Sequence, residues 1–306
     1  MSDNNSLVGG ESLQQQINDR IIVVQLLVMI FLCINFLLIL TFFQKECFYT
    51  TTRYILFAVT LLSDSFILLV SDVLLILHYF QIVMHVWLCI IISVVVLLYM
   101  IITPVTLTAM TLERYVAICM PLRHTQLCSW HSAINSILII HGLSSVPCIV
   151  VLSTFFASVS LSFYERHSVC SVDIFLVHRW QKHLCSSVNQ FYFLIMCITI
   201  VFSYVKILKV AKNASGENKK STWKGLRTVI LHAFQLLLCL IQLWCPFIEA
   251  ALPQINFRIF RSVKYFNYII FNLAPRCLSP LIYGLRDEIF VHALKHICFG
   301  SCKRSI

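Results

Sequence analysis

Long runs of apolar residues alternate with short polar connections along the whole chain. The first run, Ile21–Phe43, contains the amides Gln25 and Asn35 but no charged residue. An apolar run longer than about 18 residues can cross a bilayer as a helix. Because backbone polar groups cannot stay unpaired in lipid, we expect every run to be helical. Seven spans are predicted: Ile21–Phe43, Tyr54–Leu77, Trp87–Cys119, Ser132–Ala157, Ser186–Val210, Leu226–Leu252 and Ser262–Leu285.

The connections between the runs are short, which favours one all-α membrane bundle over separate domains. Only Ser158–Cys185 and Ala211–Gly225 have room for structure of their own. The first run follows about twenty polar residues without a small-residue cleavage site, so we interpret it as a retained span and not as a signal peptide. Three parts are predicted: an N-terminal tail at 1–20, a seven-span bundle at 21–285 and a C-terminal segment at 286–306.

The C-terminal segment contains an amphipathic stretch, Asp287–Phe299. Its apolar side chains fall near one helical face and its basic side chains opposite, which predicts a short helix lying along the membrane surface. The apolar set is Phe290, Leu294, Ile297 and Cys298, and the polar set is His292, Lys295 and His296. Cys298 and Cys302 are candidate palmitoylation sites.

Composition changes this picture only through the charges. Charged residues make up 12% of the chain, about half the usual fraction of a soluble protein, and the formal net charge is +10. Most of the Lys and Arg residues fall in alternate connections, so the charge indicates topology and not nucleic-acid binding. It predicts an extracellular N-terminus and a cytoplasmic C-terminus. The sequon at Asn4 lies on the expected outer side and is a candidate glycosylation site.

The strongest local motif is Met110–His124, at the expected inner end of the third span. It resembles the odorant-receptor form of the Asp/Glu-Arg-Tyr motif found in rhodopsin-type (class A) G-protein-coupled receptors. A charge at the membrane edge is costly unless paired, and Glu113 is the neighbour of Arg114, with Tyr115 following. The simpler alternative is an Arg that snorkels from a helix end.

The seventh span supports the same resemblance. Asn272–Arg286 is similar to the Asn-Pro-x-x-Tyr motif, with Pro280 and Tyr283 in place and Ser279 where the family usually has Asn. Such a proline kinks the helix, although a membrane helix can also simply tolerate it.

The sixth span gives a mixed signature. Lys224, Thr228 and His232 keep the odorant-receptor spacing at four-residue steps, on one helical face. Trp244-Cys245-Pro246 instead resembles the Cys-Trp-x-Pro motif of general rhodopsin-type receptors. The combination is similar to fish-type odorant receptors.

The resemblance also implies a disulfide between Cys89 and the second outer loop, with Cys170 the preferred partner and Cys185 the alternative. Asn35 and Asp64 stand at the family's intramembrane polar positions. Arg276 lies near the level of Asp64, and our hypothesis is that the two pair. A water-filled cavity, Asp72 or Glu249 are the alternatives.

The family's ligand-pocket positions carry over onto a mostly apolar set, each of which equally fits ordinary bundle packing. Val96 stands where amine receptors have an Asp, which disfavours a biogenic-amine ligand. Leu273 stands where opsins have the retinal-linking Lys, which disfavours a light receptor. The set is Ser93, Val96, Leu97, Met100, Ile101, Asn189, Tyr192, Trp244, Phe247, Ile248, Leu252, Ile269 and Asn272.

The implied function is an odorant receptor of the plasma membrane. It would bind a small odorant and activate a heterotrimeric G protein of the olfactory or stimulatory type, in contact with membrane lipids. The coupling residues would be Glu113, Arg114, Tyr115, Tyr204, Thr228, His232, Pro280 and Tyr283. No catalytic or metal motif is present, so neither an enzyme nor a cofactor is expected. The alternatives are a non-olfactory rhodopsin-type receptor, orphan or chemokine-like, and, more remotely, a transporter or channel.

Overall fold

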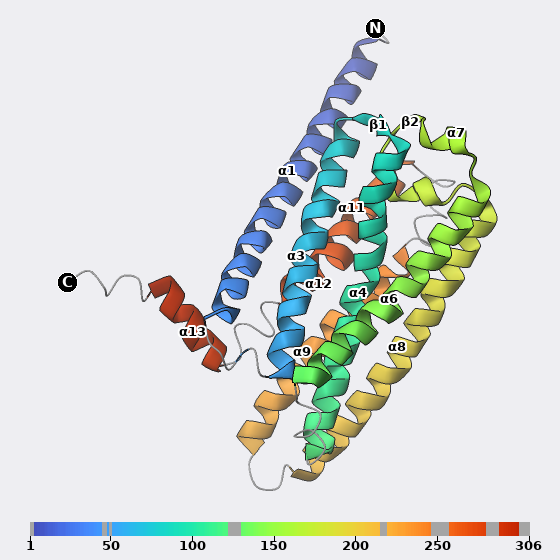
Figure 1. Cartoon of the computed structure of the whole chain (residues 1–306). Helices are drawn as coiled ribbons and strands as arrows, with labels where there is room; N and C mark the ends of the chain where they lie inside the picture. Colours follow the sequence, from blue (N-terminus) through green and yellow to red (C-terminus); the bar gives the residue numbers. More distant parts are fainter. Residues whose placement is uncertain are drawn as a thin grey trace.

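The computed structural model describes residues 3–44, 48, 51–121, 130–214, 219–245, 257–279 and 288–299. Its long helices lie side by side in one bundle (Figure 1). The first five are α1 (Asp3–Phe42), α3 (Thr52–Tyr79), α4 (Val86–Cys119), α6 (Trp130–Ser158) and α8 (Arg179–Ala214). They are followed by α9 (Lys219–Gln242), α11 (Phe257–Asn267), η3 (Tyr268–Leu273), α12 (Ala274–Ser279) and α13 (Glu288–Phe299).

Within the described residues, five helices are long and apolar enough to cross a membrane, and they match the first five predicted spans, apart from Phe43, which follows α1. Helix α1 begins at Asp3, so most of the expected tail at 1–20 continues the first span as a helix. At about 1.5 Å per residue, its 40 residues are roughly twice as long as a bilayer core is thick. The helix therefore extends past the rest of the bundle at its N-terminal end (Figure 1).

The seventh predicted span is not one regular helix. Between α11 and α12 lies η3, a π-helical turn in which the Ala274 N–H donates to the Ile269 carbonyl five residues earlier. Pro275 follows directly, and it has no N–H to donate to the carbonyl four residues before it. A wider turn relieves the clash between its ring and that carbonyl, and such turns recur at functional sites.

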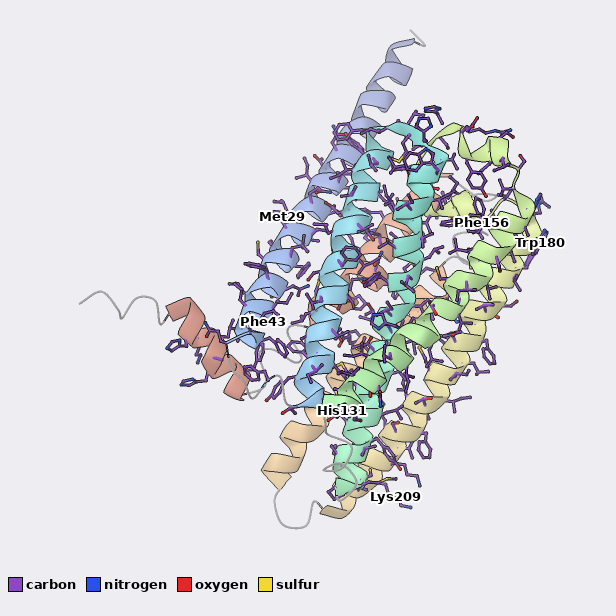
Figure 2. The ribbon with its side chains drawn as sticks, viewed as in Figure 1. Met29, Phe43, His131, Phe156, Trp180 and Lys209 are labelled. Atoms are coloured by element: carbon purple, nitrogen blue, oxygen red, sulfur yellow. A yellow bond between two sulfur atoms is a disulfide. The ribbon has the colours of Figure 1, made fainter. Side chains whose placement is uncertain are left out.

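Helix α4 is the centre of the bundle, packing against α3, α6 and α8, while α1 packs on α3 and α9 packs on α4 and α12. Helix α4 and its neighbours share a continuous buried apolar core that includes Leu61, Ile102, Leu107 and Leu236. On the outside of the bundle, large apolar side chains such as Met29 and Phe156 point away from it (Figure 2). An apolar exterior around a packed interior is the arrangement that lipid requires.

One end of the bundle is covered by the connection between α6 and α8. Strand β1 (Val83–His85) pairs antiparallel with β2 (His167–Val169), and α7 (Leu161–Tyr164) and η1 (Val172–Phe175) flank β2. Phe175 is fully buried and meets Phe155 of α6 edge to face, with ring centroids 5.3 Å apart. These elements lie at the same end of the bundle as the start of α1 (Figure 1).

The predicted amphipathic segment forms helix α13, beside the opposite end of α1 (Figure 1). Phe290 is buried, with its ring centroid 5.3 Å from that of Phe48 and 5.7 Å from that of Phe57. The basic face is exposed at His292, Lys295 and His296, as expected. The side chain of Cys298, and the whole of Cys302, lie outside the described residues.

Candidate functional site

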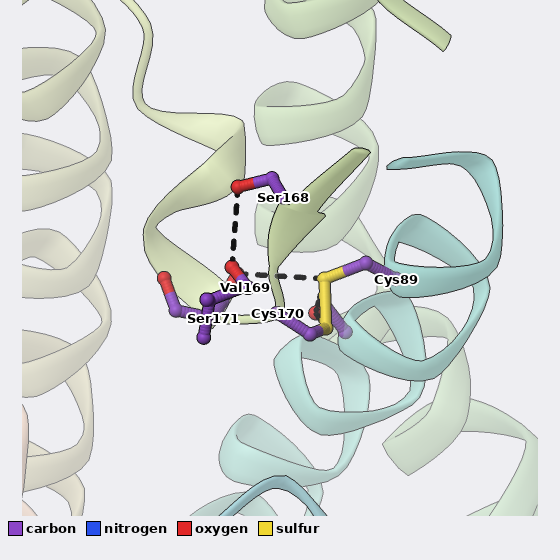
Figure 3. The surroundings of a disulfide bond; sticks show 6 residues. Cys89, Ser168, Val169, Cys170 and Ser171 are labelled. Atoms are coloured by element: carbon purple, nitrogen blue, oxygen red, sulfur yellow. Dashed lines mark hydrogen bonds between the residues drawn. A yellow bond between two sulfur atoms is a disulfide. The ribbon is translucent and has the colours of Figure 1, made fainter. Parts of the chain in front are cut away.

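A disulfide joins the bundle to the covering loop. Cys89, in the second turn of α4, is bonded to Cys170, directly after β2, with their Cα atoms 5.4 Å apart (Figure 3). Both are buried, and Cys185 is a free thiol. This confirms the preferred pairing over the alternative. The bond holds β2 and the loop around it against the start of α4.

Loss of this disulfide is expected to lower the free energy of unfolding by about 2–4 kcal/mol, because the loop it closes is long. Thermal unfolding of the purified Cys89→Ser/Cys170→Ser double variant is compared with that of the wild type. Cys185→Ser is the matched control and should unfold like the wild type. Non-reducing peptide mapping should recover Cys89 linked to Cys170, and a Cys170–Cys185 peptide would contradict the assignment.

The pocket candidates on α4 lie directly below the disulfide. Ser93 is fully buried, and its Oγ is 3.7 Å from the Cys89 sulfur and 3.9 Å from the Cys170 sulfur. Val96 and Ile101 are also buried, and Leu97 and Met100 are partly buried against neighbouring apolar clusters. All five therefore face the bundle interior, and the lining they provide is apolar with one hydroxyl.

The pocket candidates outside α4 differ from one another in what their side chains contact. The Tyr192 hydroxyl donates to the Leu143 carbonyl of α6 at 2.6 Å, so it is engaged by a neighbouring helix. Ile269 packs with apolar residues of α1 and α3. The Asn189 amide nitrogen contacts the Cys185 sulfur at 3.9 Å, and the Trp244 ring meets Phe193 edge to face. Phe247, Ile248 and Leu252 lie outside the described residues.

Charged and polar side chains meet in the middle of the bundle. Asp64 of α3 is fully buried and accepts a 2.9 Å hydrogen bond from the Thr103 hydroxyl of α4. Its Oδ1 is 3.8 Å from a terminal guanidinium nitrogen of Arg276, which is also buried. The Nε of Arg276 donates to the Asn272 carbonyl and side-chain oxygen at 3.0 and 3.1 Å. The structure thus brings together the pair that the sequence hypothesis named.

Of the alternative partners for Arg276, Asp72 instead accepts a 2.5 Å hydrogen bond from Gln25 of α1. Glu249 lies outside the described residues. Asn272, assigned from sequence to the ligand pocket, therefore positions the guanidinium of Arg276. The side chain of Ser279 is not among those described.

Asn35 belongs to the same buried centre. The hydrogen bonds Asn18–Tyr79 and Gln25–Asp72 fix the antiparallel register of α1 and α3, which places Asn35 within one helical turn of the level of Asp64. Asn35 is fully buried, and neither atom of its amide group has a hydrogen-bond partner among the described residues. Thr103 was missed by the sequence reasoning, although a hydroxyl beside Pro104 in an apolar span was a usable signal.

The coupling candidates lie at the other end of α4, away from the disulfide. Glu113, Arg114 and Tyr115 occupy its last turns and are half-buried. Tyr204 of α8 is buried, makes a hydrogen bond with Thr111 and lies within electrostatic reach of Arg114. The side chains of Thr228 and His232, and the whole of Pro280 and Tyr283, lie outside the described residues, as does the side chain of Asn4.

Comparison with known proteins places this architecture in a family. The sequence model of the 7 transmembrane receptor (rhodopsin family) matches residues 34–283. The chain is 43% identical to Odorant receptor 131-2 of Danio rerio over 97% of this chain and 91% of that protein. It is 26% identical to Olfactory receptor 52A1 of Homo sapiens, over 63% of this chain and 62% of that protein.

A further similarity is to Galanin receptor 2a of Danio rerio, at 26% identity over 65% of this chain and 55% of that protein. The chain belongs to the rhodopsin family of seven-transmembrane receptors.

Proposed function

We propose that this protein is an odorant receptor that activates a heterotrimeric G protein. The observation that carries the proposal is the 43% identity to Odorant receptor 131-2 over nearly the whole of both chains. The Met110–His124 motif, which resembles the odorant-receptor form, agrees with it.

The odorant would bind in the half of the bundle nearest the disulfide. Ser93, Val96 and Met100 of α4 supply an apolar lining with a single hydroxyl, which suits a small apolar or weakly polar molecule. Trp244, which follows α9 and contacts Phe193 of α8, is a proposed further contact. Asn189, Phe247, Ile248 and Leu252 remain proposed contacts in the same half.

The G protein would bind at the opposite end, where Arg114 and Tyr204 lie. An agonist that binds an active arrangement more tightly shifts the population toward it. We propose that α9 then moves away from α4, which opens a groove for a helix of the G protein, of the olfactory or stimulatory type. Thr228, His232, Pro280 and Tyr283 are proposed to line the groove.

The proposed orientation has the N-terminus outside the plasma membrane and the C-terminus in the cytoplasm. A disulfide persists on the oxidising side of a membrane, which favours the end that carries β1 and β2 as extracellular. Lys206 and Lys209 belong to the other end, and basic residues favour the cytoplasmic side. We propose the tail at 1–20, the bundle at 21–285 and the C-terminal segment at 286–306 as the functional divisions.

A second candidate is a non-olfactory receptor of the same family, favoured by the Trp244-Cys245-Pro246 motif and by the similarity to galanin receptors. The two candidates differ in where the gene is expressed and in the size of the agonist. An odorant receptor is expected in olfactory neurons and responds to small volatile or water-borne molecules.

The test is a ligand screen on cells that express the full chain with a stimulatory G protein, read out as cyclic AMP. Small alcohols, aldehydes, acids and amines form one panel, and neuropeptides including galanin form the second. Cells without the receptor are the control. A dose-dependent response to a member of the first panel supports the proposal, whereas responses confined to peptides contradict it in favour of the second candidate.

A further inference from the structure

Two histidine rings touch each other at the disulfide end of the bundle. His85 of β1 and His167 of β2 are direct partners in the antiparallel register. Their ring centroids are 3.9 Å apart, with 47° between the ring planes. Both residues are exposed. The receptor function proposed above uses neither of them.

The backbone that carries this pair is fixed on both sides. The Val86 N–H donates to the Arg166 carbonyl at 3.0 Å, which continues the ladder between β1 and β2. One turn further along α4, the disulfide from Cys89 ties the same two segments together (Figure 3). The ring of Trp87 stacks against that of His85, with centroids 6.3 Å apart. The two imidazoles are therefore held together before any ligand arrives.

The ring nitrogens are open for coordination. None of the hydrogen bonds made within the described part of the chain uses the imidazole of His85 or His167. By contrast, His141 in α6 is engaged, with its Nδ1 2.9 Å from the Ile137 carbonyl. The nearest cation along the chain, Arg166, lies over the Phe163 ring at 5.7 Å. A neutral imidazole nitrogen is the commonest protein ligand for transition metals.

From this geometry we propose that His85 and His167 together bind a late first-row divalent metal ion, Zn²⁺ or Cu²⁺. A metal–imidazole bond is about 2.0–2.1 Å long, so one ion between two nitrogens needs them roughly 3–4 Å apart. Rings already in contact reach that separation by rotating about their side-chain bonds. Imidazole prefers Zn²⁺ and Cu²⁺, whereas Mg²⁺ and Ca²⁺ prefer oxygen.

The site is expected to be open and exchangeable. Among the described residues, no group of three or more His, Cys, Asp or Glu side chains is placed to hold a metal. Water would therefore fill the remaining positions of an ion held by two imidazoles. The bound ion cross-links β2 to the start of α4, as the disulfide does, and so stabilises the covering loop over the bundle. A ligand that binds only the folded state raises its thermal stability.

The first experiment is thermal unfolding of the purified full-length receptor in detergent, with accessible thiols alkylated so that cysteines do not compete for metal. Zn²⁺ is expected to raise Tm by at least about 2 °C at saturation, and Mg²⁺ is expected to leave it unchanged. His85→Ala and His167→Ala should each abolish the Zn²⁺ effect. His183→Ala, an exposed histidine on α8 near the same end, is the matched control and should keep it.

The second experiment does not depend on how stable the variants are. One equivalent of Cu²⁺ is added to the alkylated receptor and its electron paramagnetic resonance spectrum is recorded. The wild type and His183→Ala should show coupling to two imidazole nitrogens, and each single variant at the pair should lose it. A wild type without a Zn²⁺ shift, or a Zn²⁺ shift or two-nitrogen spectrum that persists in His85→Ala/His167→Ala, would overturn the proposal.

Discussion

Arg276→Gln is expected to lower the free energy of unfolding by about 3–5 kcal/mol, because it strands the buried carboxylate of Asp64 without its cation. Asp64→Asn should cost a similar amount, since the guanidinium of Arg276 would then keep, among the described residues, only the oxygens of Asn272. A lone charge in a membrane interior is costly whatever its sign. Thermal unfolding in detergent and surface expression in cells are the two measurements.

The double variant Asp64→Asn/Arg276→Gln should cost clearly less than the sum of the two single variants. Its two neutral side chains carry no stranded charge, and the terminal nitrogen Nη1 of Arg276 makes no hydrogen bond with any described residue that the double variant would lose. The control is the same comparison with Asp72→Asn in place of Asp64→Asn. Asp72 lies two turns away on α3 and accepts a hydrogen bond from Gln25, so its variant should be additive with Arg276→Gln. If the loss in free energy of unfolding of the Asp64→Asn/Arg276→Gln variant equals the sum of the two single losses, the pairing is refuted.

This ion pair links the least regular part of the bundle to its centre. Arg276 follows the π-helical turn η3, and Asn272 within that turn orients its guanidinium. The partner carboxylate belongs to α3 and is also bonded to Thr103 of α4. Three segments of the bundle are thus held by one charged cluster, which explains why a charge is tolerated here at all.

The positions of the spans and of this pair were predictable for a simple reason. Lipid selects for long uninterrupted apolar runs, and a charge within such a run must find a partner at its own depth. Counting along the seventh span placed Arg276 near Asp64 without any knowledge of side-chain directions. The disulfide was favoured by the family resemblance, and the structure then chose Cys170 over Cys185.

The directions of individual side chains were not predictable. Hydropathy indicates which segment lies in the membrane but not how a helix is rotated, since apolar residues serve both faces. For Tyr192 and Ile269, only the structure shows that the Tyr192 hydroxyl contacts α6 and that Ile269 packs on α1 and α3. Their place in the ligand pocket stays a prediction. Hydropathy also does not indicate where a helix begins, because polar residues can continue it: α1 already begins at Asp3, before the apolar run at Ile21. The role of residues 1–20 as an extracellular tail stays a prediction.

Arg114→Ala is expected to reduce the agonist-driven cyclic AMP response to the level of cells without receptor, while the protein still reaches the cell surface. Arg114 stands at the end of α4 opposite the disulfide, beside the buried Tyr204 that is bonded to Thr111. It is half-buried, so its removal opens no large cavity in the core. The variant should therefore impair G-protein activation while leaving the stability of the fold unchanged.

Two further variants separate a specific role of Arg114 from a general effect of charge. Arg114→Lys keeps the charge but loses the planar guanidinium, so we expect a weakened response, between those of the alanine variant and the wild type. Lys209→Ala removes an exposed charge from the same end of the bundle (Figure 2) and should signal normally. Responses are compared at equal surface expression. If Arg114→Ala signals as well as Lys209→Ala, this arginine has no part in G-protein activation.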